Sequence, residues 1–353
     1  MSALLDRLGL TVPIIQAPMA GTSTPALAAA VSDAGGLGSI GLGAAGAERA
    51  RAMIDAVRQR TERPFNANVF CHRPARPDPV REAAWVQRLR PEFARYGAEP
   101  PERLAEIYKS FLADAAMQTL LLETRPSVVS FHFGLPSAEV VAALKGAGVV
   151  LFASATSLAE GQAVQAAGCD AVVAQGWEAG GHRGRFDPDA PDDQLGTFAL
   201  TRLLVKRLDI PVIAAGGIMD GAGVAAALAL GAAAAQLGTA FIACDETDAD
   251  ESYRRALAGE GAHHTVMTRA ISGRPARALT NRFTALGQAP GAEPAGYPMA
   301  YDAGKALNAA AKARGEGGWG AQWAGQAAPL ARPMPAAELM TILKTELAAA
   351  SRG

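Results

Sequence analysis

Residues 171–184 read AVVAQGWEAGGHRG, and this stretch decides the predicted fold. It begins with an apolar, partly β-branched run, 171–174, of the kind found in buried strands. A turn with two adjacent glycines follows and carries His182. A strand that leads into such a turn places the histidine at its carboxyl end, which is the face where α/β barrels carry their active sites. From this stretch alone, a surface loop with a solvated histidine is the alternative.

Strand and helix candidates alternate on both sides of this stretch. Thr24 is a predicted N-cap with Pro25 at the first helical position. Further helices are expected at 47–60, 137–145, 157–167, 198–207 and 221–230. Besides 171–175, strands are expected at 13–17, 37–40, 65–70, 128–134, 149–153, 211–215 and 234–239. Eight strands that alternate with helices predict an α/β protein with a parallel TIM, or (β/α)8, barrel. A doubly wound open sheet is the alternative, but no GxGxxG motif follows the first strand.

Two stretches break the alternation. Residues 71–126 are longer than a simple crossover, and we expect an insertion with helices at about 79–96 and 101–123. Residues 250–330 hold helical segments separated by loops rich in glycine and proline, which predicts an additional, mostly helical substrate lobe. The expected division is a barrel over 1–249 with its insertion, the lobe over 250–330, and a segment over 331–353 whose helix (336–350) returns to the barrel.

Composition argues against several classes of partner. The formal net charge of -1 gives no electrostatic reason to expect nucleic acid or a membrane surface. Residues 221–244 are uncharged but mostly Ala and Gly, so a buried helix and strand are expected there in place of a membrane span. The N-terminus carries Asp6 and Arg7 and lacks the apolar core of a signal peptide. A cytoplasmic protein is therefore expected.

Cysteine and histidine spacing predicts no metal site. The three cysteines, Cys71, Cys169 and Cys244, are scattered and form neither a disulfide framework nor a metal-binding pattern, which fits a reducing compartment. His72 and the pair His263–His264 lack other ligand-type residues at metal spacing. We expect these three to be surface or loop histidines.

Two glycine turns favour a phosphate site. Gly216 and Gly217 follow the seventh expected strand, and Gly238 and Thr239 follow the eighth. The turns after these two strands often bind phosphate in α/β barrels, through backbone N–H groups at a helix start. Glycines that only serve tight turns are the alternative. Neither GxxxxGK[ST] nor GxSxG is present, so a phosphate-cleaving nucleotide site and a serine hydrolase have no support.

Other polar residues lie at expected strand ends. Asn66 and Asn68 alternate on one strand and so face the same side. Asn68 and Gln175 offer amides that could bind a flat heteroaromatic ring, or they satisfy each other inside the barrel. His132 is either a site residue or a packed histidine bonded to backbone. Tyr297, Tyr301 and Lys305 recur every four residues and would share one helix face, for which the spacing alone favours an exposed amphipathic surface.

Together these segments resemble the class I nitronate monooxygenases, formerly called 2-nitropropane dioxygenases. The likeness extends along almost the full chain. It rests on PIIQAPMAG (13–21), NANVF (66–70), SFHFG (130–134), QGWEAGGHRG (175–184), AAGGI (214–218), QLGTAF (236–241) and YPMAYDAGK (297–305). The resemblance implies a TIM barrel with a helical substrate lobe and FMN bound without a covalent link.

The resemblance also implies roles for individual residues. His182 would be the catalytic residue beside the reactive face of the flavin. Cofactor-binding residues would be Met19, Ala20 and Gly21 along the isoalloxazine, Asn68, Gln175, Gly180 and Gly181 at the flavin, and Gly217, Gln236, Leu237, Gly238 and Thr239 at the phosphate. His132, Tyr297, Tyr301 and Lys305 would line the substrate pocket, where Lys305 suits the carboxylate of propionate 3-nitronate, a metabolic poison.

The implied activity is oxidation of an alkyl nitronate by O2 to a carbonyl compound and nitrite, as detoxification. The nitronate would give one electron to FMN, and the resulting flavosemiquinone would pass it to oxygen. His182 would stabilise the nitronate, or act as base on a neutral nitroalkane. The alternatives are an NAD(P)H-dependent quinone reductase or an enoyl-ACP reductase of the same superfamily, and an FMN-binding barrel for storage or sensing. No coiled-coil heptad is present, so a monomer or homodimer is expected.

Overall fold

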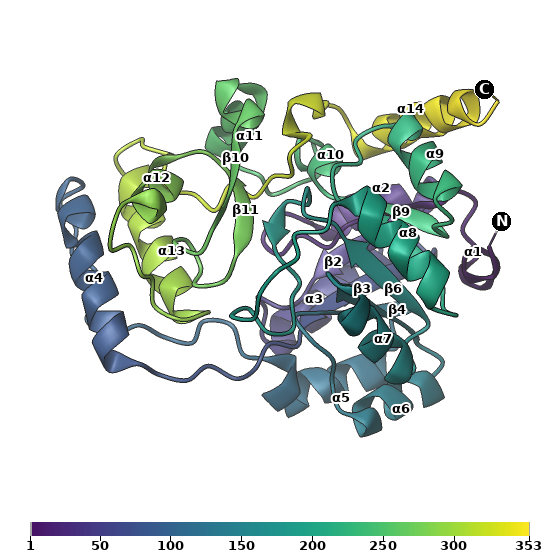
Figure 1. The fold of residues 1–353 in the computed structure, drawn as a ribbon, viewed down its shortest axis with the longest axis horizontal. Coiled ribbons are helices and arrows are strands. Elements are labelled where there is room, and N and C mark those ends of the chain that lie inside the picture. The colour runs from purple at the N-terminus through teal and green to yellow at the C-terminus, as the bar shows by residue number, and fades with distance from the viewer. Residues whose placement is uncertain (1, 353) are drawn as a thin grey trace.

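Parallel strands form a barrel at the centre of the molecule (Figure 1). The computed structural model describes residues 2–352 and orders eight of its strands as β1-β9-β8-β6-β5-β4-β3-β2. Ile15 on the first strand bridges Leu37 beside the last, and the Leu37 N–H donates to the Ile14 carbonyl at 3.0 Å, which brings the two edges together. The predicted TIM barrel is thus confirmed. The strands are β1 (Ile14–Gln16), β2 (Gly38–Gly41), β3 (Phe65–Phe70), β4 (Val128–His132), β5 (Val150–Ala155), β6 (Ala171–Gln175), β8 (Val212–Ala215) and β9 (Ala234–Leu237).

Helices cover the outside of the barrel, and several of them begin at a side chain that caps the first turn. Thr24, Ser137 and Ser157 each accept a hydrogen bond from a backbone N–H in the first turn of the helix that follows, as N-caps do. Because helices cover one face of each strand and the barrel interior the other, the strands are buried on both sides. The helices are α2 (Pro25–Asp33), α3 (Ala47–Arg58), α5 (Ala115–Thr124), α6 (Ala138–Gly146), α7 (Leu158–Ala166), α8 (Thr197–Arg207) and α9 (Gly221–Ala229).

The two ends of the chain complete the barrel core. α1 (Ala3–Leu8) places Leu4, Leu5 and Leu8 against the apolar residues that fill the amino-terminal end of the barrel. The helix after β9, α10 (Thr239–Ile242), has only four residues. The C-terminal helix α14 (Ala336–Ala350) instead packs on α9 and α2 and covers that part of the sheet. None of the helices within 2–352 has the length and apolarity to cross a membrane, and the run 221–244 contains α9, β9 and α10.

The second lobe contains helices and a small antiparallel sheet. Its helices are α11 (Glu251–Ala258), α12 (Arg282–Gln288) and α13 (Met299–Lys312). The sheet joins β10 (Thr265–Thr268) and β11 (Ala276–Leu279) to β7 (Gly181–His182), with Ala276 opposite His182. No strands were predicted in this region, because short strands that pair with a distant segment leave no periodic pattern. The lobe therefore holds the His182 segment directly, through backbone pairing.

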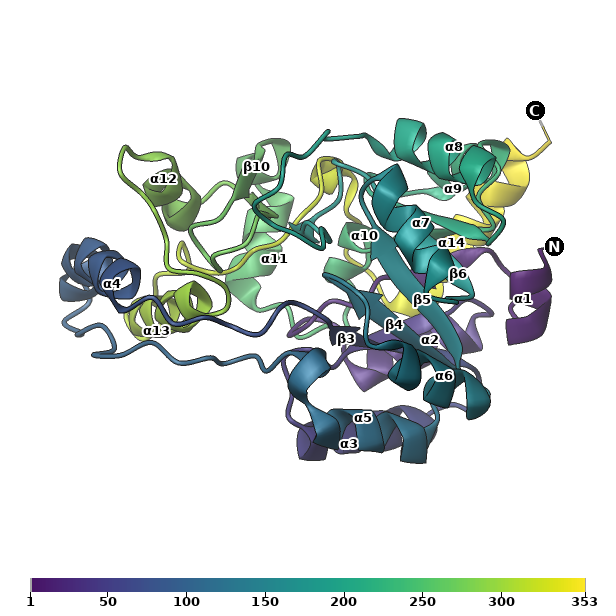
Figure 2. The ribbon, with the colours of Figure 1, turned by 60° about the horizontal axis from the view of Figure 1, so that its bottom comes forward.

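The insertion over 71–126 contributes to both parts of the molecule. α4 (Pro79–Ala94) lies beside α13 (Figure 2), and its Trp85, Leu89 and Phe93 share one core with residues of the lobe. The helix predicted over 101–123 is wrong in its first half, since the chain remains irregular until a 3₁₀ turn, Phe111–Ala113, and α5 begins only at Ala115. The carboxylate of Asp114 caps α5 there.

Candidate active site

A cavity lies at the carboxyl ends of the barrel strands, beneath the lobe. Barrel residues from β3, β4, β5 and β6 and from the turns after β1, β6, β8 and β9 form its walls, and Tyr253, Tyr301 and Trp323 close it from the lobe. Ten of the predicted cofactor-binding residues line it together with the predicted catalytic residue, His182: Met19, Ala20, Asn68, Gln175, Gly180, Gly181, Gly217, Gln236, Gly238 and Thr239. The sequence-predicted residues are thus brought together at the barrel face where catalysis is expected.

Two predicted cofactor residues do not line this cavity. Leu237 is 1% exposed, and its side chain packs in the core between the barrel and its helices. Gly21 lines an adjoining cavity instead. Both residues are next to residues that do line the main cavity. Side chains alternate along a strand, so Leu237 faces the core while its neighbours Gln236 and Gly238 face the cavity.

Two side chains hold the main-chain carbonyl of His182. The Gln175 amide donates to this oxygen from Nε2 at 2.9 Å, and its Oε1 accepts from the Gly184 N–H at 2.7 Å. The His132 ring approaches the same carbonyl oxygen with Nε2 at 3.2 Å. The position of Gln175 at a strand end suggested a ring-binding amide, whereas both ends of that amide bond to the 182–184 segment. Gln175 and His132 therefore fix the backbone on which His182 stands.

The contacts of His132 define its protonation. A carbonyl oxygen can only accept, so Nε2 carries a proton, and Nδ1, at 2.9 Å from the Ser154 hydroxyl, accepts from it in the neutral ring. Burial, partly offset by the His182 carbonyl, lowers the pKa of His132 to about 4. The sequence left open whether His132 is a site residue or a packed histidine bonded to backbone. The structure shows a packed ring bonded to backbone that also lines the cavity.

The His182 ring is neutral and is held from one side. Its Nε2 lies 2.9 Å from the Ser272 hydroxyl, and no described residue bonds to Nδ1. Burial lowers the pKa of His182 well below its ordinary value, and His132, Arg274 and His72 lower it further. Four aromatic rings surround the imidazole, with centroids of Trp323 at 5.0 Å, of Phe133 and Tyr297 at 5.6 Å and of Tyr301 at 6.1 Å. Because the ring is neutral, its Nδ1 can accept a proton in one tautomer and donate a proton in the other.

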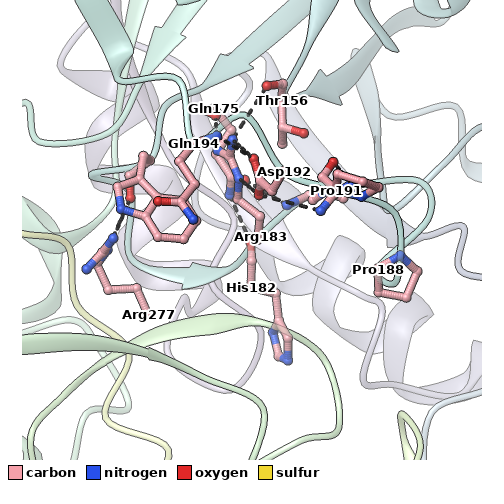
Figure 3. A network of polar contacts seen from close by, with 12 residues as sticks. Thr156, Gln175, His182, Arg183, Pro188, Pro191, Asp192, Gln194 and Arg277 are labelled. Atoms are coloured by element: carbon pink, nitrogen blue, oxygen red, sulfur yellow. Dashed lines mark hydrogen bonds and ion pairs between the residues drawn. The ribbon is translucent and has the colours of Figure 1, made fainter. Parts of the chain in front are cut away.

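Arg183 anchors the loop that follows His182. Figure 3 shows its guanidinium within reach of Gln175, Thr156 and Asp192, while the His182 side chain points away from this network. The Arg183 side chain is 1% exposed, and it pairs with both oxygens of Asp192, at 3.0 and 3.2 Å. Trp177 lies between Arg183 and Arg277, whose guanidiniums are 5.6 and 5.2 Å from its ring centre. Trp177 thus stabilises the loop and does not line the cavity.

The glycine turns leave room that side chains would fill. A Cβ at Gly180 would lie 2.5 Å from the backbone nitrogen of Gly325. Gly216 and Gly217 have φ values of 124° and 70°, which L-residues with side chains rarely adopt. The Thr239 hydroxyl oxygen accepts from the Gly325 N–H at 3.0 Å and so keeps its own proton for another acceptor. Flat apolar walls, amides and glycine turns with N–H groups fit a flavin that ends in a phosphate.

The polar face of β3 finds partners inside the barrel. The Asn66 amide donates to the Ser39 hydroxyl at 3.2 Å, and the Asn68 amide donates to the Ser130 hydroxyl at 2.9 Å. Both asparagines are buried and face the interior, as their alternation predicted. Only Asn68 lines the cavity.

Tyr297, Tyr301 and Lys305 do not share one helix face, although their spacing had predicted this. Tyr297 precedes α13, which begins at Met299, so the helical spacing does not apply to it. The Tyr301 ring lies 6.1 Å from the His182 ring and lines the main cavity. Lys305 is absent from that cavity and lines the adjoining one, where its Nζ is 4.9 Å from the Tyr108 ring centre. Tyr108, Trp323 and Ser272 were not predicted, because they come from the insertion and the lobe and belong to no motif.

His72 was predicted to be a surface or loop histidine, and it lies in a loop but not at the surface. The residue is 1% exposed, and its ring lies 5.0 Å from that of Tyr297. Neither ring nitrogen has a hydrogen-bond partner, and burial, with a further contribution from Arg274, lowers the pKa of His72 to about 4. The histidines at 263 and 264 are exposed, as predicted. Sequence could not separate these cases because the proline-rich segment around His72 reads as a surface loop.

The buried His72 makes stability depend on pH. The unfolded chain takes up a proton on this ring near its ordinary pKa of 6.5, whereas the folded chain binds it only near pH 4. Stability is therefore lost as pH falls from about 6.5 toward 4, by about 2 kcal/mol at pH 5 for this one group. His72→Phe keeps the aromatic contacts and removes the titration, so the difference in urea unfolding free energy between pH 8 and pH 5 should shrink by that amount. His263→Asn serves as the exposed control, and an unchanged difference in His72→Phe would contradict the prediction.

A barrel whose carboxyl face holds a glycine-lined cavity and a neutral histidine defines a TIM-barrel enzyme. The family model described as nitronate monooxygenase matches residues 1–346, and the chain belongs to this family of flavin-dependent oxidoreductases. It is 67% identical to a nitronate monooxygenase of Paraburkholderia phytofirmans over 98% of this chain and 94% of that protein. It is 56% identical to a nitronate monooxygenase of Pseudomonas aeruginosa over 96% and 97% of the two chains. The solved nitroalkane oxidase of Streptomyces ansochromogenes is 43% identical and superposes with a TM-score of 0.92 over 99% of both chains.

Proposed function

We propose that this enzyme oxidises alkyl nitronates with O2 to a carbonyl compound and nitrite, with propionate 3-nitronate as the substrate that is detoxified. The observation that carries the proposal is the His182 ring, which is neutral, presents an unbonded Nδ1 and stands over a cavity with a glycine-lined cradle. Family membership supports the general reaction, and the geometry supports the residue roles.

The cofactor in this proposal is FMN, bound without a covalent link. The phosphate would be held by backbone N–H groups of Gly217, Gly238 and Thr239, and Met19 and Ala20 would lie along the ring system, with Asn68 and Gly180 beside it. When bound, the flavin supplies the electron-transfer chemistry, for which no amino-acid side chain is suited. The protein supplies position and electrostatics, and the cavity walls of Phe70, Tyr301 and Trp323 limit the access of water.

His182 would serve the substrate in one of two ways. If Nε2 carries the proton and donates to Ser272, Nδ1 has a free lone pair and can remove the proton of a neutral nitroalkane. If the Ser272 hydroxyl donates to Nε2, Nδ1 carries the proton and can donate to a nitronate oxygen. The hydroxyl of Ser272 can rotate between these two arrangements. A nitronate is already deprotonated, so it requires the second arrangement only.

An anaerobic titration of the purified yellow protein tests the proposed activity. We expect propionate 3-nitronate to change the visible absorbance in the manner of one-electron reduction, and we expect NADH to leave it unchanged. Full bleaching by NADH with no response to the nitronate would contradict the proposal and favour an NAD(P)H-dependent quinone reductase or enoyl-ACP reductase. A response to neither would favour a binding protein without turnover.

A further inference from the structure

Arg274 is a buried cation without a carboxylate partner. The residue is 4% exposed, and no acidic oxygen of residues 2–352 lies within 4.0 Å of its guanidinium. Its Nη2 donates to the main-chain carbonyl of Arg185, and its Nε has no hydrogen-bond partner within the same range. Burial lowers the pKa of Arg274 to about 10, which leaves the group charged at neutral pH. An unpaired charge in the interior costs stability, so a role in the nearby site is the first explanation to test.

The carboxylates nearest to Arg274 are paired with other arginines. Asp189 and Asp187 both raise the pKa of Arg274, so their charges act on it from a distance. Asp189 pairs with Arg269 at 2.8 Å, and Asp187 pairs with Arg73 at 3.6 Å. Each of these two ion pairs is neutral as a whole. The charge of Arg274 is therefore left largely uncompensated.

Two aromatic rings connect Arg274 to His182. The guanidinium carbon lies 4.2 Å from the ring centre of Phe133 and 6.0 Å from that of Tyr297. The His182 ring lies 5.6 Å from each of the same two rings. Phe133 has a φ of 74°, a left-handed backbone that bulky residues rarely adopt, and this conformation belongs to the turn that brings its ring to both partners. Because aromatic rings surround this region in place of water, the charge is weakly screened.

The turn that carries Arg274 also holds the His182 ring. The Arg274 N–H donates to the Ser272 hydroxyl oxygen at 3.3 Å, and that hydroxyl lies 3.2 Å from the Arg274 carbonyl oxygen as a donor. The same hydroxyl is 2.9 Å from His182 Nε2. When Ser272 donates to the carbonyl, Nε2 must donate to Ser272, which leaves the lone pair on Nδ1. Residues 272–274 thus set both the orientation of the ring and the position of the charge.

The other titratable groups that face His182 are uncharged. Burial raises the pKa of Tyr297 and of Tyr301, so both phenols keep their protons. After burial, the groups that lower the pKa of His182 are His132, Arg274 and His72, and burial makes both of these histidines neutral at pH 7. Arg183, the next residue in sequence, is paired with Asp192 away from the ring (Figure 3). Arg274 is therefore the permanent charge among the groups that act on the His182 ring.

We propose that Arg274 is a positioning residue whose fixed charge keeps His182 uncharged and makes the cavity favour an anionic substrate over its neutral form. Arg274 does not line the cavity, so it acts through Phe133, Tyr297 and Ser272 and touches no substrate. The arrangement separates two tasks. Arg274 supplies a permanent positive charge, and His182 keeps a neutral ring that can exchange a proton. The part of this inference that concerns the substrate rests on the proposed function, and the part that concerns His182 does not.

Two substitutions separate the charge of Arg274 from its packing. Arg274→Gln keeps an N–H donor for the Arg185 carbonyl but has no charge, whereas Arg274→Lys keeps the charge without the planar guanidinium. We expect kcat/KM for propionate 3-nitronate to fall about tenfold or more in Arg274→Gln and to stay within about threefold of the wild type in Arg274→Lys. Arg269→Gln is the matched control, since Arg269 comes from the same segment of the lobe but pairs with Asp189, and it should keep the wild-type value.

A titration by NMR tests the effect on His182 without turnover. The chain has five histidines, and the signal that is lost in His182→Asn identifies this ring in flavin-loaded protein with 15N-labelled histidine. His182 should take up its proton at higher pH in Arg274→Gln than in the wild type or Arg274→Lys, because the nearby cation no longer opposes the charged ring.

The outcomes distinguish this inference from the proposed function. An unchanged His182 titration in Arg274→Gln, or the same shift in Arg274→Gln and Arg274→Lys, would overturn the role of the charge, and turnover of the nitronate by the wild type would still support the proposed function. The expected shift in a wild type that turns over no nitronate would support the effect of Arg274 on His182 and contradict the proposed function.

Discussion

His182→Asn is expected to keep the flavin bound and to lose most turnover. The groups that fix this segment, Gln175 and His132, bond to the main-chain carbonyl of residue 182, and β7 pairs with β11 through backbone. The fold of the segment and the glycine cradle therefore do not require the imidazole. Removing the ring removes the group whose Nδ1 faces the cavity. The loss should reach about 10²- to 10⁴-fold with a neutral nitroalkane, which needs a base, and at least about tenfold with a nitronate.

Two measurements check this expectation. The visible absorbance of purified His182→Asn gives its flavin content, and steady-state kinetics with each substrate gives kcat and KM. His263→Asn changes an exposed histidine of the lobe and should behave as the wild type in both. Unchanged kinetics with a nitronate would contradict the proposed role of His182. Loss of flavin would instead show that the ring supports the cofactor site.

The barrel was predictable because each of its signals is local. The β-branched run before Gln175, the Thr24–Pro25 helix start and the glycine turns after β8 and β9 each depend on a few neighbouring residues. The same holds for the cavity wall that the barrel contributes, since strand ends in a parallel barrel meet at one face. Leu237 was predicted to bind the cofactor but is buried in the core, because a motif of consecutive residues does not indicate which of them faces the cavity.

The lobe side of the site was not predictable, because it is built from distant segments. Ser272 reaches His182 across 90 positions, and Tyr108 comes from the irregular half of the insertion. Tyr297 seemed to continue the spacing of Tyr301 and Lys305, but the helix begins after it. His72 resembled a surface or loop histidine because nothing near it in sequence indicates that Tyr297 and the Phe133 turn pack against it. Contacts of this kind arise from packing between the lobe and the barrel, and local patterns carry no record of them.

Arg183→Met is expected to destabilise the protein and weaken flavin binding together. The substitution keeps the length of the side chain but leaves Asp192 with only its longer contact to Arg185, at 3.8 Å, and the Gln175 carbonyl without its donor. Burial raises the pKa of Asp192, but the hydrogen bond and charge of Arg183 outweigh this and hold it below its ordinary value. Loss of one partner from a buried ion pair costs about 3–5 kcal/mol. A decrease in Tm of about 5–10 °C should follow.

The coupling to flavin follows from where Arg183 binds. Its acceptor Gln175 is the residue whose amide holds the 182 carbonyl and the Gly184 N–H, so disorder in the loop would reach both His182 and the Gly180 turn. Thermal unfolding and flavin release on dilution measure the two effects. Arg63→Met, at an exposed position, should change neither. Arg183→Lys should recover only part of the thermal stability and of the flavin affinity. An ammonium group cannot bond to both oxygens of Asp192 and to the two carbonyls at once. If Arg183→Met has the same Tm as Arg63→Met, the prediction is contradicted. The loop is then held by its pairing with β11 and not by this ion pair.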